Sequence, residues 1–107
     1  MKLKFIKSIL IGDCKFKVIW DKKSSGGEFR YPWENEKGFI RIGTSKHKVN
    51  PIRTLSIINN ELKEIIQTEQ LTRVKKGDEQ GYEFHYTHKE HTDFCARLAG
   101  LLNEFIK

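Results

Sequence analysis

Apolar and polar residues alternate along the first half of the chain. Leu3 and Phe5 alternate with lysines, and the even positions of 14–20 are apolar while positions 15 and 17 are lysines. A period of two is typical of β-strands that have one buried side and one side in water. The N-terminal residues and 14–20 are therefore predicted to form strands.

Turn signals divide this half into short pieces. Residues 21–27 (DKKSSGG) are turn formers whose adjacent glycines tolerate a positive φ. Residues 28–33 predict a return strand, which Pro32 ends or confines to a sheet edge. Residues 38–43 (GFIRIG) predict another short strand. We expect these strands to form an antiparallel meander.

The pattern changes to a helical period in the second half. Asn50 and Pro51 are typical of a helix start, because asparagine caps a helix and proline suits its first position. We expect this helix to end near 69–71. One apolar stripe follows the 3.6-residue period and contains Leu55, Ile58, Leu62, Ile65 and Ile66.

A last helix is predicted after a loop at 75–81 and a short strand at 81–86. Thr87 and Glu90 form a capping box at its start. Its apolar stripe contains Phe94, Leu98, Leu101, Leu102 and Phe105. The order of elements predicts an α+β fold, with an antiparallel sheet of about four strands and two helices packed on one face.

The composition is typical of one domain over residues 1–107. The chain is 37% hydrophobic and 32% charged. Cys14 and Cys95 have no metal or redox spacing, so we expect reduced thiols and a cytoplasmic protein. The apolar run at 9–12 is too short for a secretion signal, and we expect no membrane span. Abundant lysine, isoleucine and asparagine indicate a bacterial or phage protein.

The net charge of +6 is unevenly distributed. Residues 1–54 contain 13 Lys and Arg against 5 Asp and Glu, whereas 55–107 contain 7 against 9. A basic half of this kind is suited to binding phosphate groups. The alternative is that the lysines only occupy the solvent faces of strands and loops.

Two glutamates and a run of histidines are candidates for chemistry. Glu61 and Glu64 are neighbours on the first predicted helix. Paired carboxylates bind metals or act as acid and base, although they also occur as solvated surface residues. Among His85, His88 and His91, the last two fall in the first turn of the last helix, which favours the neutral imidazole that binds metals. The alternative is that these histidines are ordinary strand and helix residues.

Residues 57–66 (IINNELKEII) resemble the active helix of zincin-type metalloproteases, or of small bacterial and phage proteins with a reduced version of that fold. In that helix a His-Glu-x-x-His or His-Glu-x-x-Glu motif places two zinc ligands one turn apart, with the first Glu as the general base. Residues 82–90 resemble the part of the small proteins that follows this helix.

The resemblance implies that Glu61 is the catalytic base and that Asn60, Glu64 and His88 are ligands of zinc or another divalent metal. Asn60 stands where the motif has a histidine, and an amide oxygen is a poor zinc ligand. The resemblance therefore implies a degenerate zincin-like scaffold with a vestigial or metal-binding site. Whether the protein is an enzyme stays open.

A second hypothesis starts from the basic first half, where cations and aromatic residues are interleaved as in sheets that bind single-stranded nucleic acid. It predicts a binding module for nucleic acid or an acidic protein partner. A third hypothesis is a structural or accessory protein that acts by protein contact. The candidate binding residues of the second hypothesis are Lys22, Lys23, Arg30, Tyr31, Trp33 and Arg41.

Overall fold

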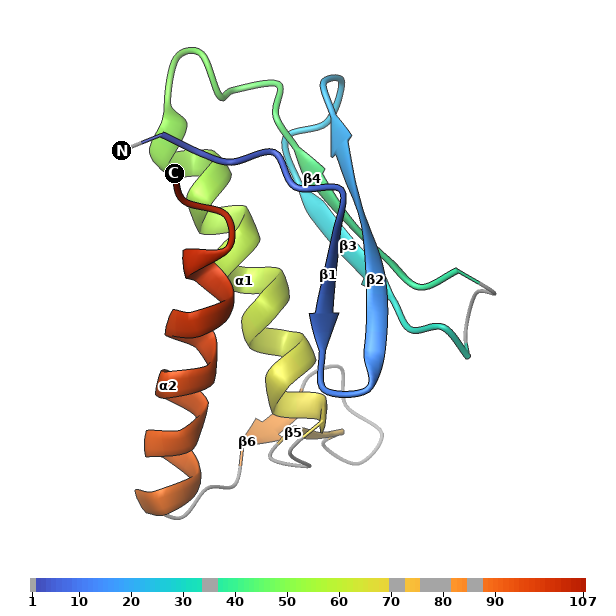
Figure 1. Ribbon diagram of the computed structural model, residues 1–107, viewed down its shortest axis with the longest axis vertical. Coiled ribbons are helices and arrows are strands. Elements are labelled where there is room, and N and C mark those ends of the chain that lie inside the picture. Colours follow the sequence, from blue (N-terminus) through green and yellow to red (C-terminus); the bar gives the residue numbers. More distant parts are fainter. Residues whose placement is uncertain (1, 34–36, 70–72, 76–81, 85–87) are drawn as a thin grey trace.

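The computed structural model describes residues 2–33, 37–69, 73–75, 82–84 and 88–107 (Figure 1). The described part contains strands together with two helices that follow β4, so the expected α+β class is confirmed. The elements are β1 (Ser8–Ile11), β2 (Cys14–Asp21), β3 (Gly27–Arg30), β4 (Phe39–Gly43), α1 (Pro51–Glu69), β5 (Arg73–Lys75), β6 (Tyr82–Phe84) and α2 (His88–Asn103).

The main sheet has four strands in the order β1-β2-β4-β3. The strands β1 and β2 are antiparallel, as are β3 and β4, but β2 and β4 are parallel, with Lys17 paired to Phe39 and Asp21 paired to Gly43. The sheet is therefore mixed, and the predicted antiparallel meander is wrong. Burial explains the order, because the two isoleucines of β4 are at most 1% exposed. The charged strand β3, followed by Pro32, takes the edge instead.

The first hairpin begins later than the alternation predicts. A tight turn at Gly12, with φ of 59°, joins β1 to β2 and pairs Ile11 with Cys14. Leu3 forms only an isolated bridge with Ile106, and the backbone N–H of Lys4 donates to the carbonyl oxygen of Phe105 at 2.7 Å. The first and last segments of the chain therefore lie side by side (Figure 1).

Helix α1 begins at Pro51, as predicted, and packs against β3 and β4. A Cβ atom placed on Gly27 would lie 2.7 Å from Cγ2 of Ile57, so glycine at this position lets the helix approach β3 closely. The predicted stripe is confirmed as core, with Leu55 half-buried and the other four residues at most 1% exposed.

Helix α2 runs antiparallel to α1 and packs along it (Figure 1). Phe94 is buried and the three leucines of the predicted stripe are half-buried. The helix ends at Asn103, so Phe105 reaches the core from the turn that follows, where it is fully buried. Among the described helices, none combines the length and hydrophobicity that crossing a bilayer requires.

A second, two-stranded sheet pairs β5 with β6. The strand expected at 81–86 is present as Tyr82–Phe84, whereas β5 was not expected, because residues 73–75 are too few to show a period. Of the loop predicted at 75–81, Lys75 belongs to β5, while 76–81 and the capping residue Thr87 lie outside the described residues.

Replacing Gly100 by alanine is expected to stabilise the protein. Gly100 lies within α2, and a Cβ atom placed there would meet no atom within 4 Å. Alanine restricts the unfolded chain more than glycine does, so we expect a gain of about 0.5–1 kcal/mol in the free energy of unfolding. Urea denaturation followed by circular dichroism measures this gain, and a loss of stability would contradict the open environment seen at this position.

Candidate functional site

The four residues singled out by the zincin resemblance lie in different environments. On α1, Asn60 is exposed, Glu61 is 5% exposed and Glu64 is half-buried. A Cβ atom placed on Gly27 would lie 3.1 Å from Oε1 of Glu61, so this carboxylate faces β3. His88 is exposed at the start of α2. The surface alternative is therefore wrong for Glu61, which points into the interface between helix and sheet.

These residues do not form a ligand cluster. Within the described part of the chain, no three His, Cys, Asp or Glu side chains are grouped so that they could hold a metal ion. His91, which neighbours His88 in sequence, is exposed, with Nε2 3.7 Å from Sγ of Cys95. His85 lies outside the described residues. A role for Glu61 as base and for Asn60, Glu64 and His88 as metal ligands stays a prediction from the sequence.

Five of the six candidate binding residues lie at two opposite ends of the sheet, and the sixth, Arg41, lies in the middle of β4. Lys22 and Lys23 are exposed in the turn between β2 and β3. Arg30 is exposed at the far end of β3, and Trp33 follows it. Figure 1 shows these two ends far apart along the strands. The six residues therefore do not make one surface.

Several of the six have contacts within the protein. The Tyr31 hydroxyl is buried and donates a hydrogen bond to the Ile65 carbonyl oxygen at 3.3 Å. Trp33 is 71% exposed and stacks on the Tyr31 ring, with centroids 4.2 Å apart. Arg41 forms an ion pair with Glu28 at 2.5 Å. Tyr31 is therefore not an exposed binding residue, because it is 6% exposed and its ring packs in the core beside Phe16.

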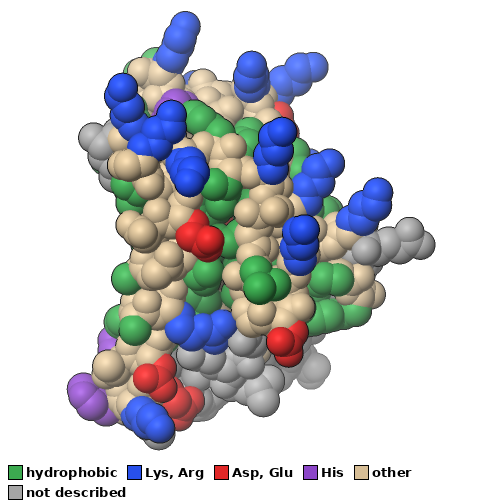
Figure 2. All heavy atoms as spheres, viewed as in Figure 1, with side chains coloured by type: hydrophobic (Ala, Val, Ile, Leu, Met, Phe, Trp, Pro, Cys, Tyr) green, Lys and Arg blue, Asp and Glu red, His purple; other side chains and the backbone are tan. Residues whose placement is uncertain are grey.

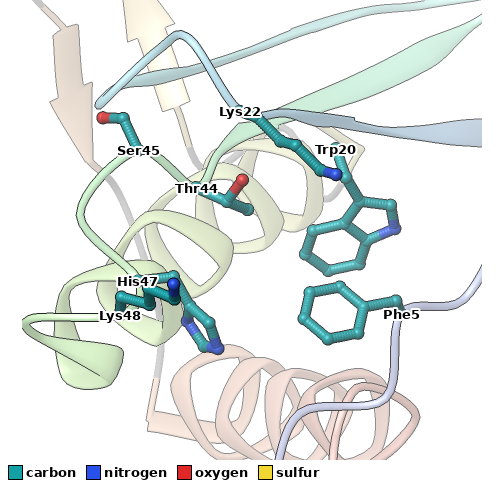
Figure 3. A pocket seen from close by; sticks show the side chains of 7 residues that line it. All are labelled: Phe5, Trp20, Lys22, Thr44, Ser45, His47 and Lys48. Atoms are coloured by element: carbon teal, nitrogen blue, oxygen red, sulfur yellow. The ribbon is translucent and has the colours of Figure 1, made fainter.

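A pocket of about 660 Å³ lies beside the turn that carries Lys22 (Figure 3). It combines aromatic rings, hydroxyl groups and ammonium groups from three separate parts of the chain. We call it the basic pocket, and its described lining consists of Phe5, Trp20, Lys22, Thr44, Ser45, His47 and Lys48.

Backbone hydrogen bonds join two of the segments that line the basic pocket. The N–H of Gly43 donates to the Gly26 carbonyl oxygen at 2.7 Å, and the N–H of Thr44 donates to the Asp21 carbonyl oxygen at 2.8 Å. A third bond, from the N–H of Ser45 to the Ser24 carbonyl oxygen, measures 3.0 Å. Together they hold the segment after β4 against the β2–β3 turn, so that Lys22 and Lys48 line one cavity.

The exposed ring of Phe5 is held in place by its surroundings. The backbone is anchored on one side by the bond from Lys4 to Phe105, and on the other by the Trp20 indole N–H, which donates to the Ile6 carbonyl oxygen at 2.9 Å. The Phe5 ring meets Trp20 edge to face, with centroids 4.8 Å apart, yet Phe5 remains 52% exposed. Phe5 therefore exposes part of its ring to solvent, while hydrogen bonds fix the backbone on both sides of it.

The His47 ring is also oriented. Its Nδ1 atom lies 2.9 Å from Oγ1 of Thr54, a residue that is 1% exposed. The ring meets Phe5 edge to face, with centroids 5.8 Å apart. Because the hydrogen bond to Thr54 uses Nδ1, the Nε2 side of the imidazole is left for other contacts.

Positive charge surrounds these rings. Figure 2 shows Lys and Arg side chains gathered over the end of the molecule that carries the first and last segments and the β2–β3 turn. A smaller pocket of about 270 Å³ shares Phe5 and His47 with the basic pocket and adds Lys2 and Lys107. Neither pocket has an Asp or Glu among its described lining residues. The arrangement suits a ligand that joins anionic groups to a planar ring.

Sequence reasoning identified only Lys22 within the basic pocket. Phe5 belongs to an alternating segment and was therefore assigned to a strand, and His47 and Lys48 fall in a stretch without periodicity. The lysines of 46–48 were the available signal, as part of the basic first half. Only the backbone bonds between distant segments reveal that these side chains share a cavity.

Comparisons with protein-family models, with curated proteins and with solved structures found no match to this chain.

Proposed function

We propose that this protein is a small basic binding module of the bacterial or phage-infected cytoplasm, and that it binds nucleic acid through the end that carries the basic pocket. The observation that carries the proposal is that Lys22 and Lys48 line the same pocket as the exposed Phe5 ring, with no carboxylate among the described lining residues. Lysines placed in this way neutralise phosphates and release the counterions that surround a nucleic acid.

Nucleic acid is favoured over an acidic protein partner by the aromatic component of the site. Carboxylates of an acidic peptide satisfy lysines, but they offer no flat ring to Phe5 or His47. Nucleic-acid sites combine both kinds of contact, because phosphates pair with cations while bases contact aromatic rings. An acidic protein is therefore the competing partner in the experiment that follows.

Fluorescence anisotropy with a labelled oligonucleotide of about 12 nucleotides tests the proposal, because ssDNA sites span roughly 4–16 nucleotides. We expect the binding constant to fall at least tenfold between about 50 mM and about 200 mM salt, since phosphate contacts make binding salt-dependent. Unlabelled polyglutamate of matched charge should compete poorly.

Two results would contradict nucleic-acid binding. One is no change in anisotropy at low salt, and the other is a binding constant that does not change with salt. Displacement of the oligonucleotide by equimolar polyglutamate would instead favour an acidic protein partner, because a simple charge surface accepts both polymers.

A further inference from the structure

The basic pocket has the size and chemistry of a site for one nucleotide unit. Its volume of about 660 Å³ falls within the roughly 300–1,000 Å³ of small-molecule sites. Phe5 and Trp20 stand together on one side, and His47 and Lys48 approach from the segment after β4 (Figure 3). The lining therefore combines aromatic rings with cations, and Lys22 lies beside Trp20.

The rings can contact a base only if that base is not stacked in a helix. In a duplex, both faces of each base are covered by neighbouring base pairs, whereas a single strand can turn a base outward onto an aromatic side chain. Phe5 is 52% exposed and its edge contacts with Trp20 and His47 leave ring surface uncovered. Its backbone is fixed by hydrogen bonds on both sides. Such a ring binds a base at a small cost in conformational entropy.

The cations beside the rings match the phosphates that flank an outward-turned base. Lys22 reaches the pocket from the β2–β3 turn, and Lys48 reaches it from the segment after β4. Neither lysine forms an ion pair with a residue that the structure describes. Both ammonium groups are therefore available to phosphates on the two sides of one nucleotide.

On the basis of the proposed function, we infer that the basic pocket selects single-stranded nucleic acid by holding one unstacked base against Phe5, with the adjacent phosphates on Lys22 and Lys48. The charge surface alone binds any nucleic acid. The pocket adds a preference for strands whose bases are free.

The experiment compares three ligands of equal length and charge per strand with the full chain at one salt concentration: a single-stranded oligothymidylate, the same strand with abasic sites, and a duplex. We expect the intact single strand to bind at least fivefold more tightly than the abasic strand, because stacking of one base on an aromatic ring contributes measurably to binding. When affinities are compared per phosphate, the protein should bind the duplex no more tightly than it binds the abasic strand.

The Phe5→Ala variant should lose roughly tenfold in affinity for the intact strand and nothing for the abasic strand, whereas Phe5→Tyr should keep both affinities. Phe5 is half outside the core, so both variants should fold, which circular dichroism checks. Equal wild-type affinities for intact and abasic strands would overturn base recognition while leaving nucleic-acid binding intact. No binding to any of the three ligands would overturn both.

Discussion

Replacing Gly43 by alanine is expected to destabilise the protein by about 2–3 kcal/mol, which is the cost of overpacking a site that cannot yield. A Cβ atom placed on Gly43 would overlap the Ser24 carbonyl oxygen and lie 2.6 Å from the Gly26 carbonyl oxygen. Both oxygens belong to the backbone, so the overlap with the new Cβ atom can be removed only if the β2–β3 turn moves away. That movement breaks the 2.7 Å hydrogen bond from Gly43 to Gly26.

Thermal unfolding followed by circular dichroism measures the effect of Gly43→Ala. For a domain of this size, 2–3 kcal/mol corresponds to a fall of roughly 8–20 °C in the melting temperature. Gly26→Ala is the matched control, because it makes the same change in the same turn where no atom lies within 4 Å. Equal melting temperatures for the two variants would show that the turn does not pack against Gly43.

The second large effect is expected from the double charge reversal Lys22→Glu/Lys48→Glu. Each lysine is assigned one phosphate, and loss of two phosphate contacts should reduce the salt slope of single-strand binding by about 1.4, at about 0.7 per contact. Because glutamates also repel phosphates, affinity at about 0.1 M salt should fall on the order of 100-fold. Both side chains are exposed, so the fold should not change.

The control for this variant is Lys63→Glu/Lys89→Glu. These lysines are exposed on α1 and α2, and neither lines the basic pocket. Both double variants change the net charge from +6 to +2, so any difference between them reports position and not total charge. Equal losses of affinity in the two variants would contradict binding at the basic pocket and indicate attraction by the whole molecule.

Local patterns were sufficient to locate most elements. The apolar stripe of α1 identified a helix whose start at Pro51 and buried face are confirmed. Within β2, Phe16 and Val18 are buried and the two lysines beside them are exposed, as alternation predicts. These predictions succeed because the period of each element is set by its own backbone geometry.

The order of the strands in the sheet could not be predicted from hydrophobic periodicity. Alternation shows which side of β4 is buried, but it does not show which strands flank it. In the structure β4 separates β3 from β2, although β2 and β3 are joined by a short turn. Neighbours in sequence usually pair, so the meander was the natural expectation. The gain from burying Ile40 and Ile42 at the centre of the sheet outweighs that tendency.

For the candidate site as well, some features could be predicted from the sequence and others only from the tertiary structure. By itself, the sequence determined that the first half is basic and aromatic, and that Glu61 and Glu64 lie one turn apart on a helix. Only the tertiary structure decided that Glu61 is buried against β3, and that Phe5, Lys22 and His47 share one pocket. The physical reason is that charge and periodicity are properties of neighbouring residues, whereas a pocket depends on backbone hydrogen bonds between segments that are distant in the sequence.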